Sequence, residues 1–311
     1  MSGGYASRLS EYSNKGICNL PEIVESGRTL KNKLTKFADL VKASEYITIL
    51  TGAGISTSAG IPDFRGPKGI WTVEEKQKNG TKRARRDRSR IRDLKKPRLE
   101  NEMIPNEVSS SALTRDEKDG IKIENKSPSS TDSFADACPT QTHRIITKLV
   151  ECGKVNYVIT QNVDGLHRRS GLPRSKHSVL HGCVFTEKCE LCNKEYFRDF
   201  DVQGVSFQKT GRKCTIENCN GDLRDTILDW EDELPEEDFD LAIEHCEKSD
   251  LVIALGTSLR IEPAGSLPTK GKNFAIVNLQ RTPYDDQAKI IIRARVDDVM
   301  NDLMLKLGIP L

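Results

Sequence analysis

A glycine-rich turn follows the apolar run YITILT (46–51) and is followed closely by charged residues. Gly52 and Gly54 match the G-x-G that begins the usual dinucleotide-binding fingerprint, G-x-G-x-x-G. Thr57 stands where that fingerprint has its third glycine. Such turns after a strand often let backbone N–H groups approach a phosphate. Asp63 and Arg65 come next, and a charged pair beside a phosphate-binding turn indicates chemistry rather than packing. We therefore expect the N–H groups of residues 53–56 to approach a phosphate.

Nine cysteines are present, and four of them form two close pairs. The pairs are Cys189-x₂-Cys192 and Cys214-x₄-Cys219, a spacing that is typical of zinc sites. The second pair is wider than usual, so Cys183 remains a spare candidate ligand. Four thiolates leave no open coordination position, and we therefore predict a structural rather than a catalytic zinc.

Three polar residues follow apolar runs and suit proton transfer or ligand binding. Asn162 and Asp164 are two residues apart, so in an extended turn their side chains point the same way. His181 lies between Leu180 and Gly182. An imidazole titrates near neutral pH, which suits a general base that removes a hydroxyl proton.

Four short runs are apolar throughout, as buried parallel strands are. They are residues 46–51, 156–160, 251–255 and 273–279. Helical patterns alternate with them, at residues 30–43, 140–151, 236–248 and 296–307. This alternation predicts an α/β fold, a Rossmann-like parallel sheet with helices on both faces. Ligands of such sheets bind beyond the carboxyl ends of the strands, where the polar turns meet.

Composition shows that part of the chain is polar and strongly basic. Of its 311 residues, 36% are hydrophobic, and the net charge is only +2. Residues 76–98 nevertheless hold twelve Lys and Arg against two Asp, a local charge of +10. We expect residues 76–133 to be a disordered insertion. No apolar run approaches the roughly 20 residues that cross a bilayer, and the N-terminus lacks a secretory signal.

Several motifs occur in one order that resembles the sirtuin family of NAD-dependent protein-lysine deacylases. They are GAGIS (52–56), GIPDFRG (60–66), TQNVDGLH (160–167), LHG (180–182), the cysteine pairs, GTS (256–258) and VNLQ (277–280). TGRKC (210–214), LRDTILDWEDELP (223–235) and GTSLRIEPAGSLP (256–268) are similar to the sirtuin 6 branch in particular. The resemblance covers residues 1–75 and 134–311.

The resemblance implies a domain organisation and a reaction. The expected parts are an N-terminal extension and helix (1–45), a Rossmann-like NAD-binding domain in two parts (46–182 and 225–311) and a zinc-binding module (183–224). The implied reaction transfers an acyl group from lysine to the ADP-ribose part of NAD and releases nicotinamide. The implied substrates are acylated histone tails. From its own composition, the basic insertion is expected to bind chromatin or DNA and to direct the protein to the nucleus. No membrane partner is expected.

The resemblance also assigns site residues, and it implies that the phosphate expected at residues 53–56 is a pyrophosphate. His181 is the implied catalytic base, with Asn162 and Asp164 as catalytic residues that hold the ribose and the nicotinamide amide. Phe64 is expected to cover the sugar. Trp230, in an acidic run, is the candidate for the lysine groove, although the two tryptophans also suit a core. The implied NAD-binding set is Gly52, Ala53, Gly54, Ser56, Thr57, Asp63, Phe64, Arg65, Trp71, Gln161, Asn162, Asp164, His181, Gly256, Thr257, Ser258, Asn278, Leu279, Gln280 and Val296.

Three other functions compete with deacylation. A mono-ADP-ribosyltransferase would use the same site, because a protein nucleophile can attack the same ribose carbon. Dinucleotide-binding sheets usually occur in oxidoreductases, but the third glycine of the fingerprint and an obvious hydride-acceptor site are missing from this sequence. A non-catalytic, zinc-containing chromatin binder has no need of Asn162, Asp164 and His181. The sequence leaves open whether acetyl or long-chain acyl groups are preferred.

Overall fold

The structure, a computed structural model, describes residues 2–12, 15–79 and 134–311. The chain divides into two units, residues 1–74 with 132–311 and residues 75–131. The basic run at 82–98, and nearly all of the insertion predicted to be disordered, lie outside the described residues. Residues 70–79 are helical, so the expectation of disorder from residue 76 is wrong for 76–79. Glu, Lys and Gln, which favour helices, dominate that stretch.

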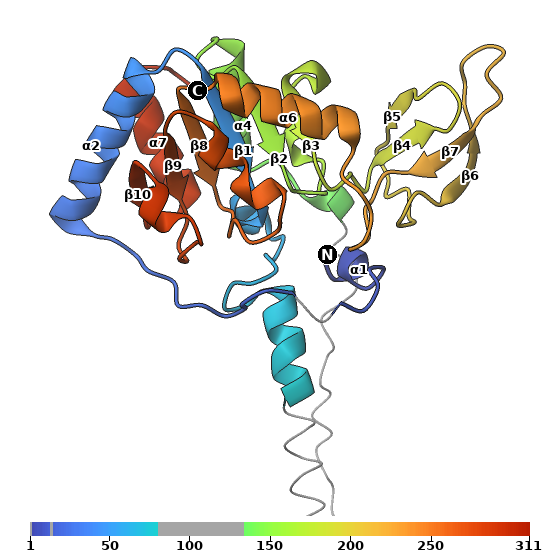
Figure 1. The fold of residues 1–311 in the computed structure, drawn as a ribbon, viewed down its shortest axis with the longest axis horizontal. Helices are drawn as coiled ribbons and strands as arrows, with labels where there is room; N and C mark the ends of the chain where they lie inside the picture. Colours follow the sequence, from blue (N-terminus) through green and yellow to red (C-terminus); the bar gives the residue numbers. More distant parts are fainter. Residues whose placement is uncertain (1, 13–14, 80–133) are drawn as a thin grey trace, which may run out of the picture. The chain divides into compact units, whose positions relative to one another are not determined.

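The larger unit is built on a six-stranded parallel sheet (Figure 1). The strands are β1 (Ile47–Thr51), β2 (Tyr157–Thr160), β3 (His177–Val179), β8 (Leu251–Leu255), β9 (Phe274–Val277) and β10 (Ile290–Ile292). Their order is β10-β9-β8-β1-β2-β3, and every neighbouring pair is parallel. The predicted parallel sheet is confirmed. The sequence does not predict β3 and β10, because three residues are too few to show a pattern.

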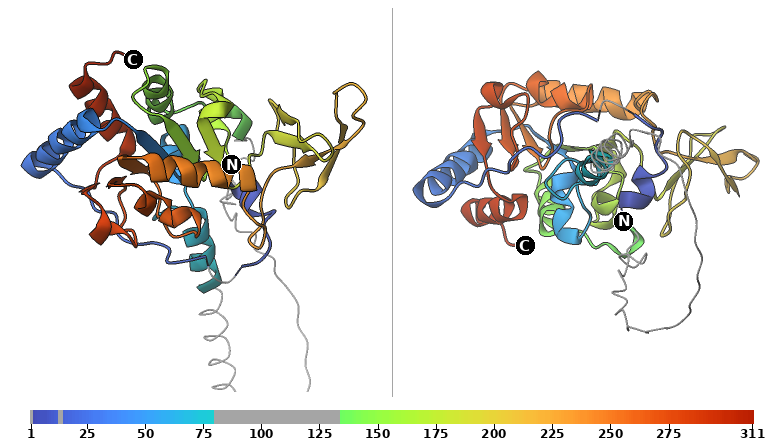
Figure 2. Two further views of the ribbon diagram at one scale, coloured as in Figure 1. Left: turned by 45° about the horizontal axis from the view of Figure 1, so that its top comes forward. Right: turned by 90° about the horizontal axis from the view of Figure 1, so that it is seen from below.

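Helices cover both faces of this sheet (Figure 2). They are α2 (Gly27–Ala43), α4 (Gln141–Glu151), α6 (Glu236–Lys248) and α7 (Val296–Leu307), and the short helices α1 (Ser2–Ala6) and α5 (Leu166–Arg169) lie elsewhere. Core side chains of α2, α4 and α7 share one cluster with Ile47 and Ile49 of β1. Leu50, which points the other way, packs in a second cluster with Ala242 and Cys246 of α6. This alternation along a strand buries both faces of the sheet.

A second, antiparallel sheet forms from the cysteine-rich stretch, in the order β5-β4-β7-β6. Its strands are β4 (Thr186–Cys189), β5 (Glu195–Phe197), β6 (Lys209–Lys213) and β7 (Asp222–Asp225). A third apolar cluster, which includes Val163, Leu166, Val184, Phe185 and Ile227, joins its base to the loop after β2. None of the helices in the described parts of the chain combines the length and hydrophobicity needed to span a bilayer.

The turns after β1 and β8 touch through bare backbone. Gly54 N–H donates to the Gly256 carbonyl at 2.8 Å, and Gly52 N–H donates to the Leu255 carbonyl at 3.0 Å. A Cβ on Gly256 would lie 2.7 Å from the backbone nitrogen of Ile55, and Gly256 has φ +59°. Glycine is therefore required here by both the close approach and the left-handed backbone.

We predict that Gly256→Ala lowers the free energy of unfolding by about 3 kcal/mol, the sum of left-handed strain and overpacking. Gly153→Ala is the matched control, because Gly153 has φ +72° but no atom within 4 Å of the point that its Cβ would occupy. The Gly153→Ala substitution should lower the free energy of unfolding by only about 1 kcal/mol. Denaturant unfolding of both variants gives the comparison. Equal losses would show that the contact between the two turns adds nothing.

Candidate functional site

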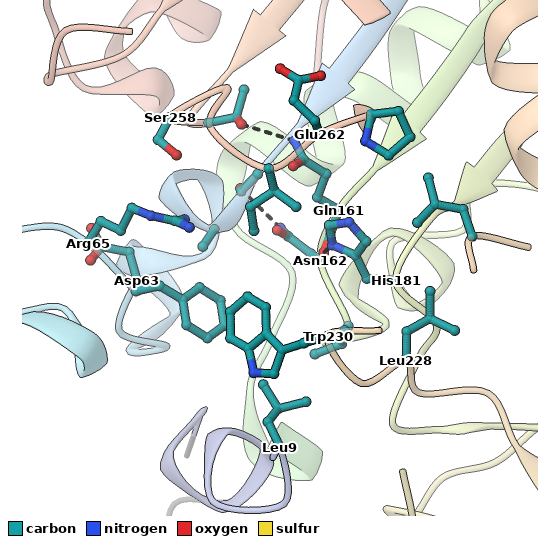
Figure 3. Close-up of a pocket in the computed structure, with 18 of the residues that line it drawn as sticks. Leu9, Asp63, Arg65, Gln161, Asn162, His181, Leu228, Trp230, Ser258 and Glu262 are labelled. Atoms are coloured by element: carbon teal, nitrogen blue, oxygen red, sulfur yellow. Dashed lines mark hydrogen bonds between the residues drawn. The ribbon is translucent and has the colours of Figure 1, made fainter. Parts of the chain in front are cut away.

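A cavity of about 670 Å³ opens at the carboxyl edge of the parallel sheet (Figure 3). The turns after β1, β2, β8 and β9 line it, with His181 after β3 and the segment before α6. Sixteen residues of the predicted NAD- and lysine-binding sets line the cavity: Gly52, Ala53, Gly54, Asp63, Phe64, Arg65, Trp71, Gln161, Asn162, His181, Trp230, Gly256, Thr257, Ser258, Asn278 and Gln280. The polar turns meet at one edge, as a parallel sheet requires.

Five predicted residues do not line this cavity: Ser56, Thr57, Asp164, Leu279 and Val296. Val296, at the start of α7, packs in the core cluster of α2 and α4. Ser56 and Asp164 are buried beneath the turn after β1. The cavity instead includes Tyr5 and Leu9 from the N-terminal segment. Nothing in the sequence of that segment signals this placement.

His181 presents one ring nitrogen without a hydrogen-bond partner among the described residues. Its Nδ1 lies 3.1 Å from the carbonyl oxygen of Gln161. A carbonyl only accepts, so Nδ1 carries the proton and Nε2 carries the lone pair. Burial lowers the pKa of His181 to about 4, and the ring is therefore neutral at pH 7. A neutral imidazole with a lone pair in a cavity can accept a proton.

Asn162 and Asp164 meet at the hydroxyl of Ser56. Asn162 Nδ2 donates to the Gly52 carbonyl at 3.1 Å and to Ser56 Oγ at 3.3 Å. Ser56 Oγ donates to Asp164 Oδ2 at 2.6 Å. The two side chains do converge, as their spacing predicts. Only Asn162 lines the large cavity, however. Asp164 does not line it and is linked to Asn162 through the Ser56 hydroxyl.

The N–H groups of the turn after β1 are mostly used within the protein. Gly54 N–H donates to Gly256, while Ile55 and Ser56 donate to the carbonyls of Gly52 and Ala53. Three of the four donors of residues 53–56 therefore already have partners within the protein, and pyrophosphate binding by this turn stays a prediction. Hydrogen bonds within the tight turn and to the turn after β8 already use these donors.

Arg65 brings a buried positive charge to the cavity. The residue is 8% exposed, and its guanidinium carbon lies 4.5 Å from the centre of the Trp71 ring. Arg65 Nε donates to the Lys15 carbonyl at 2.9 Å. Among the described residues, no carboxylate lies within ion-pair distance of this guanidinium. Burial lowers the pKa of Arg65 to about 10, so the charge persists at pH 7 and favours an anionic ligand.

Aromatic rings form one wall of the cavity. The ring centres of Phe64 and Trp71 are 4.6 Å apart, and those of Trp71 and Trp230 are 5.2 Å apart. Tyr12 stacks on Trp230 with ring centres 4.7 Å apart. Both tryptophans line the cavity, so neither is a simple core residue. Acidic side chains also line the cavity: Asp229, Asp232, Glu233, Glu236 and Asp240, which are near Trp230 in the sequence, and Glu262, which follows β8.

The four paired cysteines converge at the end of the antiparallel sheet. The sulfur atoms of Cys189, Cys192, Cys214 and Cys219 all lie within 4.8 Å of one another. The Cys189–Cys219 and Cys192–Cys214 sulfur separations are 3.5 and 3.6 Å. A tetrahedron with zinc–sulfur bonds of about 2.3 Å has edges of roughly 3.8 Å, so this set fits one zinc ion. Cys183 is buried in the third apolar cluster and is not a member.

A known protein family matches the part of the chain that carries most of these residues. The family model described as "Sir2 family" matches residues 52–120 and 105–263. The chain is 40% identical over 315 residues to the NAD-dependent protein deacetylase SRT1 of Arabidopsis thaliana, which it matches along 100% of its own length. It is 38% identical over 322 residues to the NAD-dependent protein deacetylase Sirt6 of Drosophila melanogaster. The chain spans 57% of the Arabidopsis protein and 86% of the Drosophila protein.

A solved structure shares the fold. It is a complex of Sir2 with a deacetylated p53 peptide and 3'-O-acetyl-ADP-ribose. The TM-score is 0.58 at 29% identity, and the alignment covers 89% of this chain and 100% of that one. The resemblance stated from the sequence motifs is thereby confirmed at the level of the family.

We predict one zinc ion per chain by elemental analysis and its loss in Cys192→Ser. Because site formation and folding are coupled, this variant should also unfold at a lower temperature. Cys183→Ala is the control, since it should keep the zinc while removing a buried thiol. Full zinc content in Cys192→Ser would contradict the assignment of the ligands.

We also predict that buried histidines destabilise the protein in acid. Burial lowers the pKa of His177 to about 4, below the roughly 6.5 of an unfolded chain. The unfolded state therefore binds the proton first as the pH falls from about 6.5 to about 4, and stability is lost in that window. The free energy of unfolding should fall by about 2 kcal/mol less in His177→Gln than in the wild type between about pH 7 and pH 5. Denaturant unfolding at both pH values measures it, and an unchanged pH dependence would contradict the assignment.

Proposed function

The chain belongs to the Sir2 family, and from this membership we propose that it is an NAD-dependent protein-lysine deacylase. One water molecule is consumed, and the products are nicotinamide, the free lysine and O-acyl-ADP-ribose. One observation supports this most strongly: His181, Arg65 and Asn162 all line a single cavity at the sheet edge. A hydroxyl base, an anion-binding cation and an amide are the groups that such a reaction requires of the protein.

Each residue has a defined task in this proposal. NAD, when bound, supplies the ribose carbon that receives the acyl oxygen. Arg65 binds the phosphate groups, because it carries a positive charge into the cavity and forms no ion pair within 4.0 Å among the described residues. His181 Nε2 accepts a proton from a ribose hydroxyl, and the Gln161 carbonyl keeps the ring in the required tautomer. Asn162 binds the ribose directly, while Asp164 orients Asn162 through Ser56.

The cavity's mouth supports a basic peptide substrate. Glu233, Glu236 and Asp240 are exposed there, and no ion pair involves them among the described residues. Negative charge at the mouth attracts Lys- and Arg-rich segments, so acylated histone tails are the proposed substrates. Trp230, which lines the cavity beside these acids, is the proposed wall of the lysine groove.

The proposal extends to location. The run KRARRDRSRIRDLKKPR (82–98) has the composition of a nuclear import signal or a DNA-phosphate contact. We propose that the protein acts in the nucleus, on chromatin. This part of the proposal is based on the sequence, since the run lies outside the described residues.

Mass spectrometry of the products tests the reaction. The full chain, NAD and an acetylated histone-tail peptide should yield deacetylated peptide and O-acetyl-ADP-ribose. A peptide that gains the mass of ADP-ribose would instead identify a mono-ADP-ribosyltransferase. An NADH absorbance change without peptide turnover would identify an oxidoreductase.

We predict that His181→Tyr slows deacetylation at least about 100-fold, the range expected for loss of a general base. NAD binding should change far less, because the contacts of Arg65 and Asn162 remain. His245→Phe is the control, since His245 stacks on Tyr157 at the opposite end of the sheet from the cavity. Wild-type turnover in His181→Tyr would remove His181 from the mechanism.

We predict that replacing residues 82–131 with a short Gly/Ser linker preserves peptide deacetylation and weakens DNA binding. The salt dependence of DNA binding should also become shallower, because the ten cationic side chains of the basic run are lost. Replacing only residues 99–131, which leaves the basic run intact, is the control and should leave DNA affinity nearly unchanged. Equal DNA affinity in both variants would contradict this role.

A further inference from the structure

Glu262 lines the cavity at the sheet edge, yet the proposed reaction assigns it no task. It lies between β8 and the 3₁₀ helix Ala264–Lys270, and it is exposed. Figure 3 shows Glu262 and Trp230 on opposite sides of His181. Trp230 is the proposed wall of the lysine groove. When an acyl-lysine reaches His181, residues on the other side of it therefore pass close to Glu262.

Two hydrogen bonds fix the Glu262 carboxylate. The Tyr284 hydroxyl donates to Oε1 at 2.6 Å, and the Ser266 N–H donates to Oε2 at 3.2 Å. The hydrogen bond to Glu262 raises the pKa of Tyr284 to about 12, so the hydroxyl keeps its proton at neutral pH and remains a donor. Holding an exposed glutamate in one rotamer costs side-chain entropy before any ligand binds. The carboxylate is thus preorganised, which lowers the cost of binding a partner.

The backbone of the loop makes room for this carboxylate. Leu259 is 0% exposed and has φ +52°, which is uncommon for a residue other than glycine. Its N–H donates to Thr257 Oγ1 at 3.2 Å, which helps to hold this conformation. A Cβ on Gly265 would lie 2.8 Å from the Leu259 carbonyl oxygen and 3.1 Å from Glu262 Oε1. Backbone strain of this kind is found most often at functional sites.

The charge of Glu262 is not neutralised within the described parts of the chain. No Lys, Arg or His there lies within ion-pair distance of this carboxylate. Arg260, two residues earlier, is engaged elsewhere, because its Nη2 donates to the Arg281 carbonyl at 3.1 Å. The two hydrogen bonds use about half of the roughly four acceptor positions of a carboxylate. Glu262 can therefore still accept the N–H donors of a cation.

A cationic side chain suits Glu262 better than the cofactor does. NAD carries negative charge at its phosphates, which a carboxylate repels. Glu236 and Asp240 of α6 line the same cavity. Ala242 of α6 and Ala264, two residues after Glu262, share the second apolar cluster. Negative charge in this part of the cavity therefore comes from two segments, and it attracts positive charge.

We propose that Glu262 selects peptides that carry an Arg or Lys close to the acyl-lysine, by pairing with that side chain. Tyr284 is a positioning residue, because it holds the carboxylate and does not line the cavity. The inference rests on the proposed function, since it requires the acyl-lysine to reach His181. The exposed acids before and within α6 attract basic segments in general, whereas the fixed Glu262 carboxylate recognises one position of the peptide.

Peptide binding without turnover tests this role. ADP-ribose replaces NAD so that no reaction occurs, and fluorescence anisotropy of labelled peptides gives dissociation constants for the full chain. The parent peptide has a central acetyl-lysine with Gln at positions −2, −1, +1 and +2, and four further peptides each carry one Arg at one of these positions. The wild type should bind at least one of the four roughly three- to fivefold more tightly than the parent, as expected for a partly exposed ion pair.

Four variants separate the charge of Glu262 from its positioning. Glu262→Gln should bring the Arg preference at that position close to one, and Glu262→Arg should replace it with a preference for Glu. Tyr284→Phe should reduce the preference without abolishing it, because the charge remains and one hydrogen bond is lost. Asp286→Asn is the control, since Asp286 is an exposed acid that does not line the cavity, and it should keep the wild-type preference.

Three outcomes would overturn the proposal. They are an absence of any Arg preference in the wild type, an Arg preference that persists in Glu262→Gln, and an equal loss of preference in Asp286→Asn. Turnover is measured separately, with NAD in place of ADP-ribose. Binding of the acetylated peptides without their turnover would contradict the proposed reaction, and the Arg preference in binding would still decide the role of Glu262.

Discussion

The contact between two bare backbone turns, after β1 and after β8, sets the geometry of the site. Gly54 donates to the Gly256 carbonyl, and neither position has room for a Cβ. This contact fixes the turn that carries Ser56, and the Ser56 hydroxyl in turn holds Asn162 and Asp164. Parallel strands bring the turns to one edge, but the glycines decide how closely they pack. The cavity is therefore shaped by main-chain contacts before any ligand binds.

Charge is the second constraint on the cavity. The Arg65 guanidinium is buried against Trp71, and no carboxylate pairs with it among the described residues. The Trp71 ring and the negative charge of Asp63 stabilise this buried cation, which also lines the cavity and can attract an anionic ligand there. The turn N–H groups, which the glycine motif predicts to bind the phosphates, are largely used within the turn. We therefore propose that phosphate binding depends more on Arg65 than the motif predicts.

Much of the fold can be predicted from the sequence where the pattern is long or buried on both sides. The helix at residues 236–248 and the strand at 251–255 have the predicted bounds, because acidic residues start the helix and an apolar run fills the strand. β3 and β10 are not predicted, since three residues carry no period. In the site, the cysteine spacing predicts the cluster, whereas Tyr5 and Leu9 reach the cavity only through tertiary packing. Direct contact of Asp164 with the ligand stays a prediction, and spacing alone does not show the Ser56 hydroxyl that lies between Asp164 and Asn162.

The central claim is that the cavity is preformed for an anionic ligand that pairs with Arg65. Calorimetric titration of ADP-ribose into the full chain, without peptide, tests this claim most directly. The account predicts binding to the wild type and an affinity at least roughly tenfold weaker in Arg65→Gln, as expected for loss of a charged hydrogen bond. Arg260→Gln, which removes a neighbouring cation that does not line the cavity, should have little effect. Equal affinity of the wild type and Arg65→Gln for ADP-ribose would contradict the account.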